Sequence, residues 1–151
     1  MKRFLFAMLL MAFLAGCKES DWRDPYTGTF NFTCRKSTMV TDDVKWNEIS
    51  IDTTYFTSDV VLESSDRIKI QFGTGTIGVD LDSGNDSLYM TVKPIIKKNG
   101  ELEFPSAEYP QGCHNHIEGK YLTTDTIRLD ISYGYLIGGY DKYQIVGVRV
   151  R

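Results

Sequence analysis

Apolar and polar residues alternate along most of the chain after residue 25. The clearest example is residues 26–34, where one face carries Gly28, Phe30, Phe32 and Cys34. Successive side chains of a β-strand point to opposite faces, so this pattern predicts a half-buried strand with Cys34 directed inward.

Nine or ten such strands are expected in all, and no segment longer than a turn has helical periodicity. Three strands begin with a turn residue and an aspartate, at Asp66, Asp86 and Asp125. Asn99–Gly100 predicts a tight hairpin, and Pro94 predicts an edge position or a bulge. The expected strands cover residues 26–34, 44–62 (one or two strands, with a bulge near 57–59), 65–70, 77–81, 85–90, 94–96, 102–104, 117–122, 126–133 and 140–150.

Short strands with hairpin-length connections predict an antiparallel meander. Such a sheet must protect its edges, and closure into a barrel does so by pairing the last strand with the first. We therefore expect an all-β fold that closes as a β-barrel. A two-sheet β-sandwich is the alternative, because periodicity alone does not separate the two.

The N-terminal segment has the anatomy of an export signal. Lys2 and Arg3 precede an unbroken apolar run, and Leu14–Cys17 reads Leu-Ala-Gly-Cys. This ending resembles a bacterial lipobox. The resemblance implies cleavage before Cys17 and acyl chains such as palmitate on Cys17, which would anchor the protein in the membrane. Residues 1–16 are then the signal peptide, 17–25 the lipidated cysteine and tether, and 26–151 a single all-β domain.

Charge and cysteine content indicate the compartment in which the protein folds and the classes of partner it can bind. The formal net charge is −3, or about −5 without Lys2 and Arg3, and no basic block is present, so nucleic acid is not an expected partner. With Cys17 carrying lipid, Cys34 and Cys113 remain as a pair in an oxidising compartment. We predict a disulfide between them; two separate buried thiols are the alternative.

The start and end of the domain resemble known proteins. Arg23-Asp24-Pro25-Tyr26-x-Gly28-x-Phe30 looks like the Gly-x-Trp start of lipocalin-type barrels with Phe in place of Trp, and Gly147-x-Arg149 lies near the C-terminus. The mature chain resembles small lipocalin-like lipoproteins of Bacteroidetes-type bacteria. This resemblance implies a lipocalin-like β-barrel with a binding or structural role in the envelope, anchored in the outer membrane at its periplasmic face or at the cell surface.

Candidate chemistry is confined to one cluster, Cys113-His114-Asn115-His116. On an extended strand His114 and His116 share a face about 7 Å apart, which would suit a shared metal ion. Neither a metal-ligand spacing such as Cys-x-x-Cys nor a nucleophile motif accompanies them. We therefore expect no cofactor and no catalysis, and a metal-dependent enzyme using His114 and His116 is the least favoured hypothesis.

The aromatic content, 13% of the chain, favours a binding role. We expect a non-catalytic binding or accessory module for a small apolar or aromatic ligand held inside the barrel. The alternative is a structural or interaction subunit of a surface complex, using an exposed sheet edge or the hairpin at residues 133–140. The ten aromatic residues that could line a barrel mouth are Tyr55, Phe56, Tyr89, Phe104, Tyr109, Tyr121, Tyr133, Tyr135, Tyr140 and Tyr143.

Overall fold

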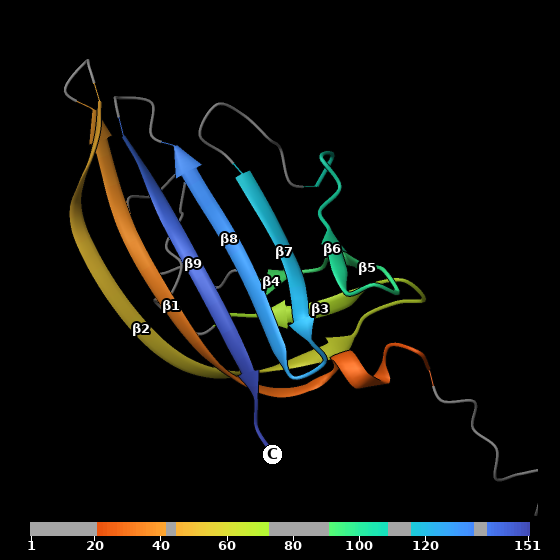
Figure 1. Ribbon diagram of the computed structural model, residues 1–151. Coiled ribbons are helices and arrows are strands. Elements are labelled where there is room, and N and C mark those ends of the chain that lie inside the picture. The colour runs from red at the N-terminus through yellow and green to blue at the C-terminus, as the bar shows by residue number, and fades with distance from the viewer. Residues whose placement is uncertain (1–20, 42–44, 73–90, 109–115, 135–138) are drawn as a thin grey trace, which may run out of the picture.

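The computed structural model describes residues 21–41, 45–72, 91–108, 116–134 and 139–151, and nearly all of these lie in one curled β-sheet (Figure 1). A single 3₁₀ turn, η1 (Asp24–Tyr26), precedes the strands. The strands are β1 (Gly28–Thr41), β2 (Trp46–Leu62), β3 (Ile68–Gln71), β4 (Thr91–Val92), β5 (Ile95–Ile96), β6 (Glu101–Glu103), β7 (His116–Thr123), β8 (Thr126–Gly134) and β9 (Gly139–Arg149).

The nine strands form one sheet in the order β4-β3-β2-β1-β9-β8-β7-β6-β5. Each ladder is antiparallel, and β1 pairs with β9 over Phe30–Val40. The predicted all-β antiparallel meander is therefore confirmed. Its shape is barrel-like, a single curled sheet rather than the two packed sheets of a sandwich.

At one end of the sheet, hydrogen bonds complete the ring through the segment that holds β4 and β5. β4 pairs with β3 and β5 pairs with β6, and the backbone N–H of Ile68 donates to Pro94 at 3.2 Å. The N–H of Ile96 donates to the carbonyl of Asp66 at 2.9 Å. Pro94 interrupts the segment at the point where its pairing changes strands, as expected for a residue that cannot donate to a ladder.

The inside of this closed end is filled by apolar side chains. Alternation along β1 turns Phe30, Phe32 and Cys34 inward, where each is at most 1% exposed. Gly147 lies opposite Phe32, and its missing side chain leaves room for the phenyl ring. Other inward residues that are fully buried include Val60, Ile68, Ile70, Phe72, Val92, Ile127, Leu129, Tyr143 and Ile145.

Residues 46–62 form one continuous strand, so the expectation of a bulge near residues 57–59 is wrong. The ladder between β1 and β2 is regular from Ser50 to Val60, and its one register shift falls at Ile49, opposite Thr38 and Met39. Tyr55 and Phe56 keep the strict alternation. Tyr55 is 75% exposed on the outer face, whereas Phe56 packs inward against the core.

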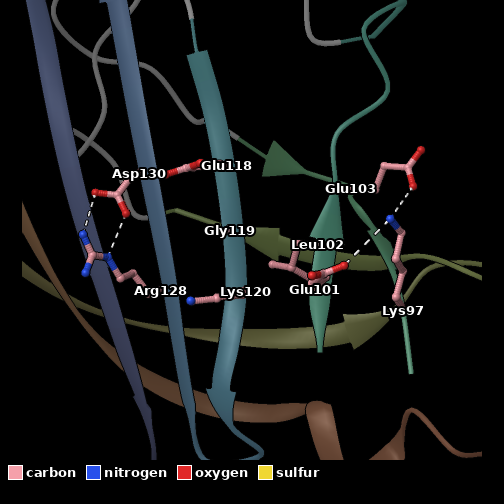
Figure 2. A pocket seen from close by; sticks show the side chains of 9 residues that line it. All are labelled: Lys97, Glu101, Leu102, Glu103, Glu118, Gly119, Lys120, Arg128 and Asp130. Carbon is pink, nitrogen blue, oxygen red and sulfur yellow. Dashed lines mark hydrogen bonds and ion pairs between the residues drawn. The ribbon is translucent and has the colours of Figure 1, made fainter. Parts of the chain in front are cut away.

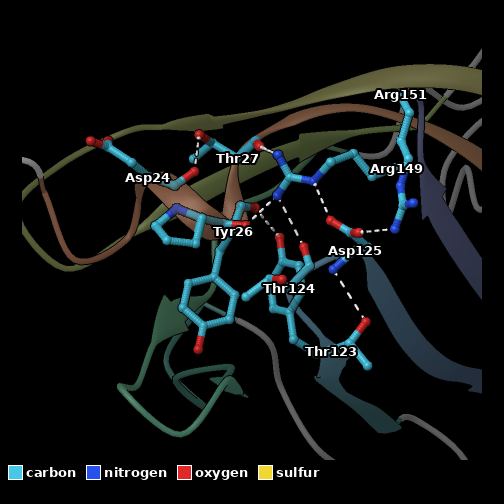
Figure 3. A network of polar contacts seen from close by, with 10 residues as sticks. Asp24, Tyr26, Thr27, Thr123, Thr124, Asp125, Arg149 and Arg151 are labelled. Carbon is cyan, nitrogen blue, oxygen red and sulfur yellow. Dashed lines mark hydrogen bonds and ion pairs between the residues drawn. The ribbon is translucent and has the colours of Figure 1, made fainter.

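The N-terminal turn is fixed across the closed end by Arg149 (Figure 3). Its guanidinium donates to the carbonyls of Pro25, Thr27 and Thr124, pairs with Asp125 at 3.0 Å and lies 5.1 Å from the ring centre of Phe30. The motif that starts the domain and the motif near its C-terminus, two of the features that carry the lipocalin resemblance, are therefore in contact. Residues 21–25, expected as part of the tether, lie against the barrel.

We call this end the base. It consists of η1, the C-terminal Arg151 and three turns at residues 63–67, 97–100 and 123–125. The β5–β6 turn matches the predicted hairpin: Gly100 has φ +83°, a conformation that glycine adopts without strain, and its N–H donates to Lys97 at 2.9 Å. Tyr26 links η1 to this turn, since its hydroxyl donates to the carbonyl of Lys98 at 3.4 Å.

Candidate functional site

Toward the end of the sheet opposite the base, the inner face changes from apolar to polar. Residues directly opposite each other in an antiparallel pair share a face, so the ladders place the polar residues together. Lys36 lies opposite Asp52 and Tyr143, and Asp141 lies opposite Thr38 and Tyr133. We call this group the inner polar tier: Lys36, Thr38, Asp52, Tyr133, Asp141 and Tyr143.

Asp141 is the centre of the inner polar tier. It is 2% exposed. Its carboxylate accepts a hydrogen bond from Thr38 Oγ1 at 2.7 Å and forms an ion pair with Lys36 Nζ at 2.9 Å. The hydroxyl of Tyr143 lies 3.4 Å from the same carboxylate, and Lys36 Nζ lies 5.7 Å from the centre of the Tyr143 ring. A buried carboxylate is costly unless it is paired and hydrogen-bonded, and here both conditions are met.

Solvent reaches part of this tier. The side chain of Lys36 is 39% exposed, and Asp52, on the inner face of β2, is also exposed. Phe56 lies on the same face of β2 as Asp52, nearer the base. It is half-buried and stacks on Phe32 with ring centres 5.0 Å apart. Charged and hydroxyl groups thus lie next to an apolar surface on one concave face. This combination of an apolar wall with a few convergent polar groups is typical of small-molecule sites.

The predicted site residues fall in different parts of the chain. Cys17, Cys113 and His114 lie outside the described residues, so the lipidation, the disulfide and the His114–His116 pairing stay predictions. Cys34 is buried inward as expected, and burial, with a smaller contribution from Asp52, raises the pKa of its thiol to about 11. As a thiol it is protonated at neutral pH and therefore a poor nucleophile.

His116 begins β7 and points to the outer face. Its Nε2 lies 3.4 Å from Glu118 Oε2, and both side chains are more than half exposed. Within the described ranges, no three His, Cys, Asp or Glu side chains gather as a metal site would require.

The predicted aromatic residues divide between the two faces. Tyr133 and Tyr143 belong to the inner polar tier, and Tyr121 lies in the core, where its hydroxyl donates to the carbonyl of Tyr26 at 2.5 Å. Burial raises the pKa of Tyr121 above its usual range. Tyr55 and Tyr140 lie on the outer face, where Tyr140 contacts Trp46 edge to face at 4.9 Å. Phe56 and Phe104 pack against the core, and Tyr89, Tyr109 and Tyr135 lie outside the described residues.

The outer face carries a shallow hollow of about 450 Å³ across β5 to β8 (Figure 2). A second hollow of about 330 Å³ adjoins it toward β9 and shares Glu118, Arg128 and Asp130. The charged side chains here pair with one another: Arg128 lies 2.7 Å from Asp130, and Lys97 lies 3.1 Å from Glu103. Despite partial burial, the hydrogen bond from Arg128 holds the pKa of Asp130 below its usual value.

The outer hollow and the inner polar tier differ in how much stabilisation their charged groups need. Exposed ion pairs on a sheet surface contribute about 0–1 kcal/mol each and are common on solvated faces. The outer hollow is explained by such pairs alone. Asp141, by contrast, is a fully buried carboxylate that the fold stabilises with three neighbours. The inner polar tier is therefore the stronger candidate site.

Sequence reasoning did not identify Lys36, Asp52 or Asp141. A signal for two of them was present, because the alternation that turns Phe30, Phe32 and Cys34 inward also places Lys36 on the inner face. In the same way, the alternation that turns Ile145 and Tyr143 inward places Asp141 on the inner face. A charged residue at an inward position of a strand is the pattern that would have identified them.

Comparisons with known proteins give one weak likeness. No protein-family model matches the chain, and no curated protein matches it. Among solved structures, the crystal structure of the ywiB protein from Bacillus subtilis is similar with a TM-score of 0.40 and 12% sequence identity, covering 85% of this chain and 99% of that one. The described residues include no helix long and apolar enough to cross a membrane.

Proposed function

We propose that this protein is a lipid-anchored lipoprotein of the cell envelope that binds a small ligand without catalysis. The ligand lies against the inner polar tier. The observation that carries this proposal is the buried Asp141 carboxylate, held by Lys36, Thr38 and Tyr143 at the boundary of an apolar core.

The packed base restricts where a ligand can lie. Phe30, Phe32 and Ile145 are at most 1% exposed and fill the barrel below the tier, so the ligand does not reach the closed end. Its apolar or aromatic body would contact Phe56, and a polar group would meet the exposed parts of Lys36 and Asp52. We therefore infer an amphipathic ligand rather than a wholly apolar one.

The anchor rests on the sequence of residues 1–17. A positive start, an apolar run and the Leu-Ala-Gly-Cys ending support export, cleavage before Cys17 and acylation of its thiol. More than one acyl chain is needed for stable attachment, and a bacterial lipoprotein carries enough of them. We propose the outer membrane as the site of attachment, at its periplasmic face or at the cell surface.

Ligand binding can be tested with two aromatic probes of opposite charge. Anilinonaphthalene sulfonate carries an anionic group and dansyl cadaverine a cationic one, and both increase in fluorescence in apolar surroundings. We expect at least one probe to bind saturably. Phe56→Ala should lower the affinity for that probe about tenfold, equivalent to about 1.4 kcal/mol.

The adjacent residue provides a matched control. Tyr55→Ala removes an aromatic ring of similar size from the same strand, but from the outer face, where it is 75% exposed. The proposal predicts unchanged probe affinity for this variant. Equal weakening by both substitutions, or no saturable binding of either probe to the wild-type protein, would contradict a ligand site on the inner face.

A second candidate function is an interaction subunit of a surface complex, supported by the outer face of β2. Ile49, Ile51 and Tyr55 are 63%, 55% and 75% exposed on that face. β2 pairs with β1 along one edge. Along its other edge, among the described residues, it pairs with a strand only at Val60, Val61 and Leu62. If this face binds a partner, Ile51→Ser and Tyr55→Ser should reduce co-purification of envelope proteins, whereas Phe56→Ala should not.

A further inference from the structure

The chain enters the domain at the base, and its entry is rigidly held. Arg23 is 5% exposed and donates to the carbonyls of Ser64 and Arg67 in the β2–β3 turn. Its guanidinium also makes two hydrogen bonds to the Asp21 carboxylate, at 2.9 and 2.5 Å, and these hydrogen bonds lower the pKa of Asp21 to about 2. The segment from Asp21 onward therefore cannot swing relative to the barrel.

We propose that the base faces the lipid bilayer surface, with the inner polar tier directed away from it. This inference rests on the proposed acylation of Cys17. Four residue steps separate Cys17 from Asp21, and a fully extended chain covers at most about 14 Å over that distance. Since the lipid and the docked segment are so close in the sequence, the base must lie next to the membrane.

An exposed aromatic side chain close to this short connection suits a membrane surface. Trp22 is 39% exposed and packs edge to face against Tyr26, with ring centres 6.4 Å apart. Tryptophan is favoured at membrane–water interfaces because its ring is apolar and its N–H is polar. Charges of both signs lie on the same end, among them Lys98, Arg151, Asp24 and Asp125, so the base presents no uniformly basic surface.

The opposite end of the sheet lies far from the bilayer in this arrangement. β1 runs from Gly28 at the base, and Lys36 lies eight residues along it, about 27 Å of strand. Trp46, the first residue of β2, pairs with Thr41 at the far end of the same ladder. The tier therefore faces the aqueous side rather than the membrane.

The two tryptophans of the chain offer a direct test, because one lies at each end. They are almost equally exposed, 39% for Trp22 and 40% for Trp46. Trp46→Phe leaves Trp22 alone, and Trp22→Phe leaves Trp46 alone. Each lipidated protein is placed in phosphatidylcholine vesicles that contain a lipid with a nitroxide on its headgroup, and tryptophan emission is compared with that in unlabelled vesicles.

We expect Trp22 emission to fall roughly twofold or more, since a chain of five residue steps holds it within about 18 Å of the acylated residue, and Trp46 emission to stay nearly constant. Acrylamide, a soluble quencher, should affect both tryptophans nearly equally in the unacylated protein free in solution, where they are 39% and 40% exposed, and Trp22 less than Trp46 once the lipidated protein is in unlabelled vesicles. The wild-type protein, with both residues, should be quenched to an intermediate extent, and this measurement does not depend on either variant folding.

Two kinds of failure are distinguishable. In the first, the intact mass shows acyl chains on Cys17, but either Trp46 is quenched more than Trp22 or neither tryptophan is quenched. The proposed orientation is then wrong and the anchor stands. If Cys17 carries no acyl mass, the anchor in the proposed function is wrong and the orientation is lost with it.

Discussion

At the scale of single residues, the ion pair between Lys36 and Asp141 is the most consequential contact in the inner polar tier. The Asp141 side chain is 3% exposed and that of Lys36 is 39% exposed, so the two partners differ in how much solvation they lose. Removing the cation leaves a carboxylate that water barely reaches, and such a group is strongly destabilising. Removing both charges eliminates that penalty.

We therefore predict that Lys36→Met lowers the free energy of unfolding by about 2–3 kcal/mol, somewhat less than for a fully buried pair. The double variant Lys36→Met/Asp141→Leu should lose less than the sum of the single variants, with a coupling of about 1–2 kcal/mol. Urea unfolding of the four proteins in the cycle measures this.

Lys142→Met serves as the control. Lys142 is the neighbour of Asp141 on β9 and is exposed on the outer face, so its replacement should change stability by no more than about 0.5 kcal/mol. Strict additivity of Lys36→Met and Asp141→Leu would show that the pair does not organise the tier.

At the scale of strands, the phase of the alternation decides which side chains meet. The sequence predicts the phase of β1 up to Cys34 and of β8 correctly, because the apolar positions there recur at every second residue without interruption. In β2 the prediction of a bulge near residues 57–59 fails. Polar residues there do not mark a change of phase, and the extra residue is Ile49, where the sequence carries no turn signal.

Gly147 shows how closely neighbouring strands pack. A methyl group at this position would lie 2.4 Å from Cε1 of Phe32 and 2.8 Å from Cγ2 of Ile127. Since Phe32 is itself enclosed by other core residues, it has little room to move. Gly147→Ala should therefore lower the free energy of unfolding by about 1–3 kcal/mol through overpacking.

Val146→Ala is the matched comparison for thermal or urea unfolding. Val146 precedes Gly147 in β9 but lies on the outer face, 38% exposed, and we expect a change of no more than about 0.5 kcal/mol. If Gly147→Ala were as stable as the wild-type protein, the inward packing of Phe32 on β9 would be wrong.

At the scale of the whole molecule, the fold was largely predictable and the site was not. Strand alternation and hairpin signals such as Asn99–Gly100 are local, and they specify an antiparallel meander. The inner polar tier depends instead on which strands are neighbours. Lys36 and Asp141 are 105 positions apart in the sequence and meet only because β1 pairs with β9.

Closure of the base gives the molecule two different ends. Arg149, Arg23 and the three turns hold η1 across one end, and the polar tier lies near the other. An anchor at residue 17 would therefore determine which end faces the membrane. Ligand access and attachment would be separated along the length of the barrel.

The central claim, that a lipid-anchored barrel binds a small ligand on its inner face, is tested most directly by native mass spectrometry. The protein is solubilised from its own envelope in mild detergent and weighed intact. We predict a chain that begins at acylated Cys17 and carries a stoichiometric small-molecule adduct, retained in Tyr55→Ala and lost in Phe56→Ala. An unacylated Cys17, or an adduct that is absent from the wild-type protein or equally retained in both variants, would contradict the claim.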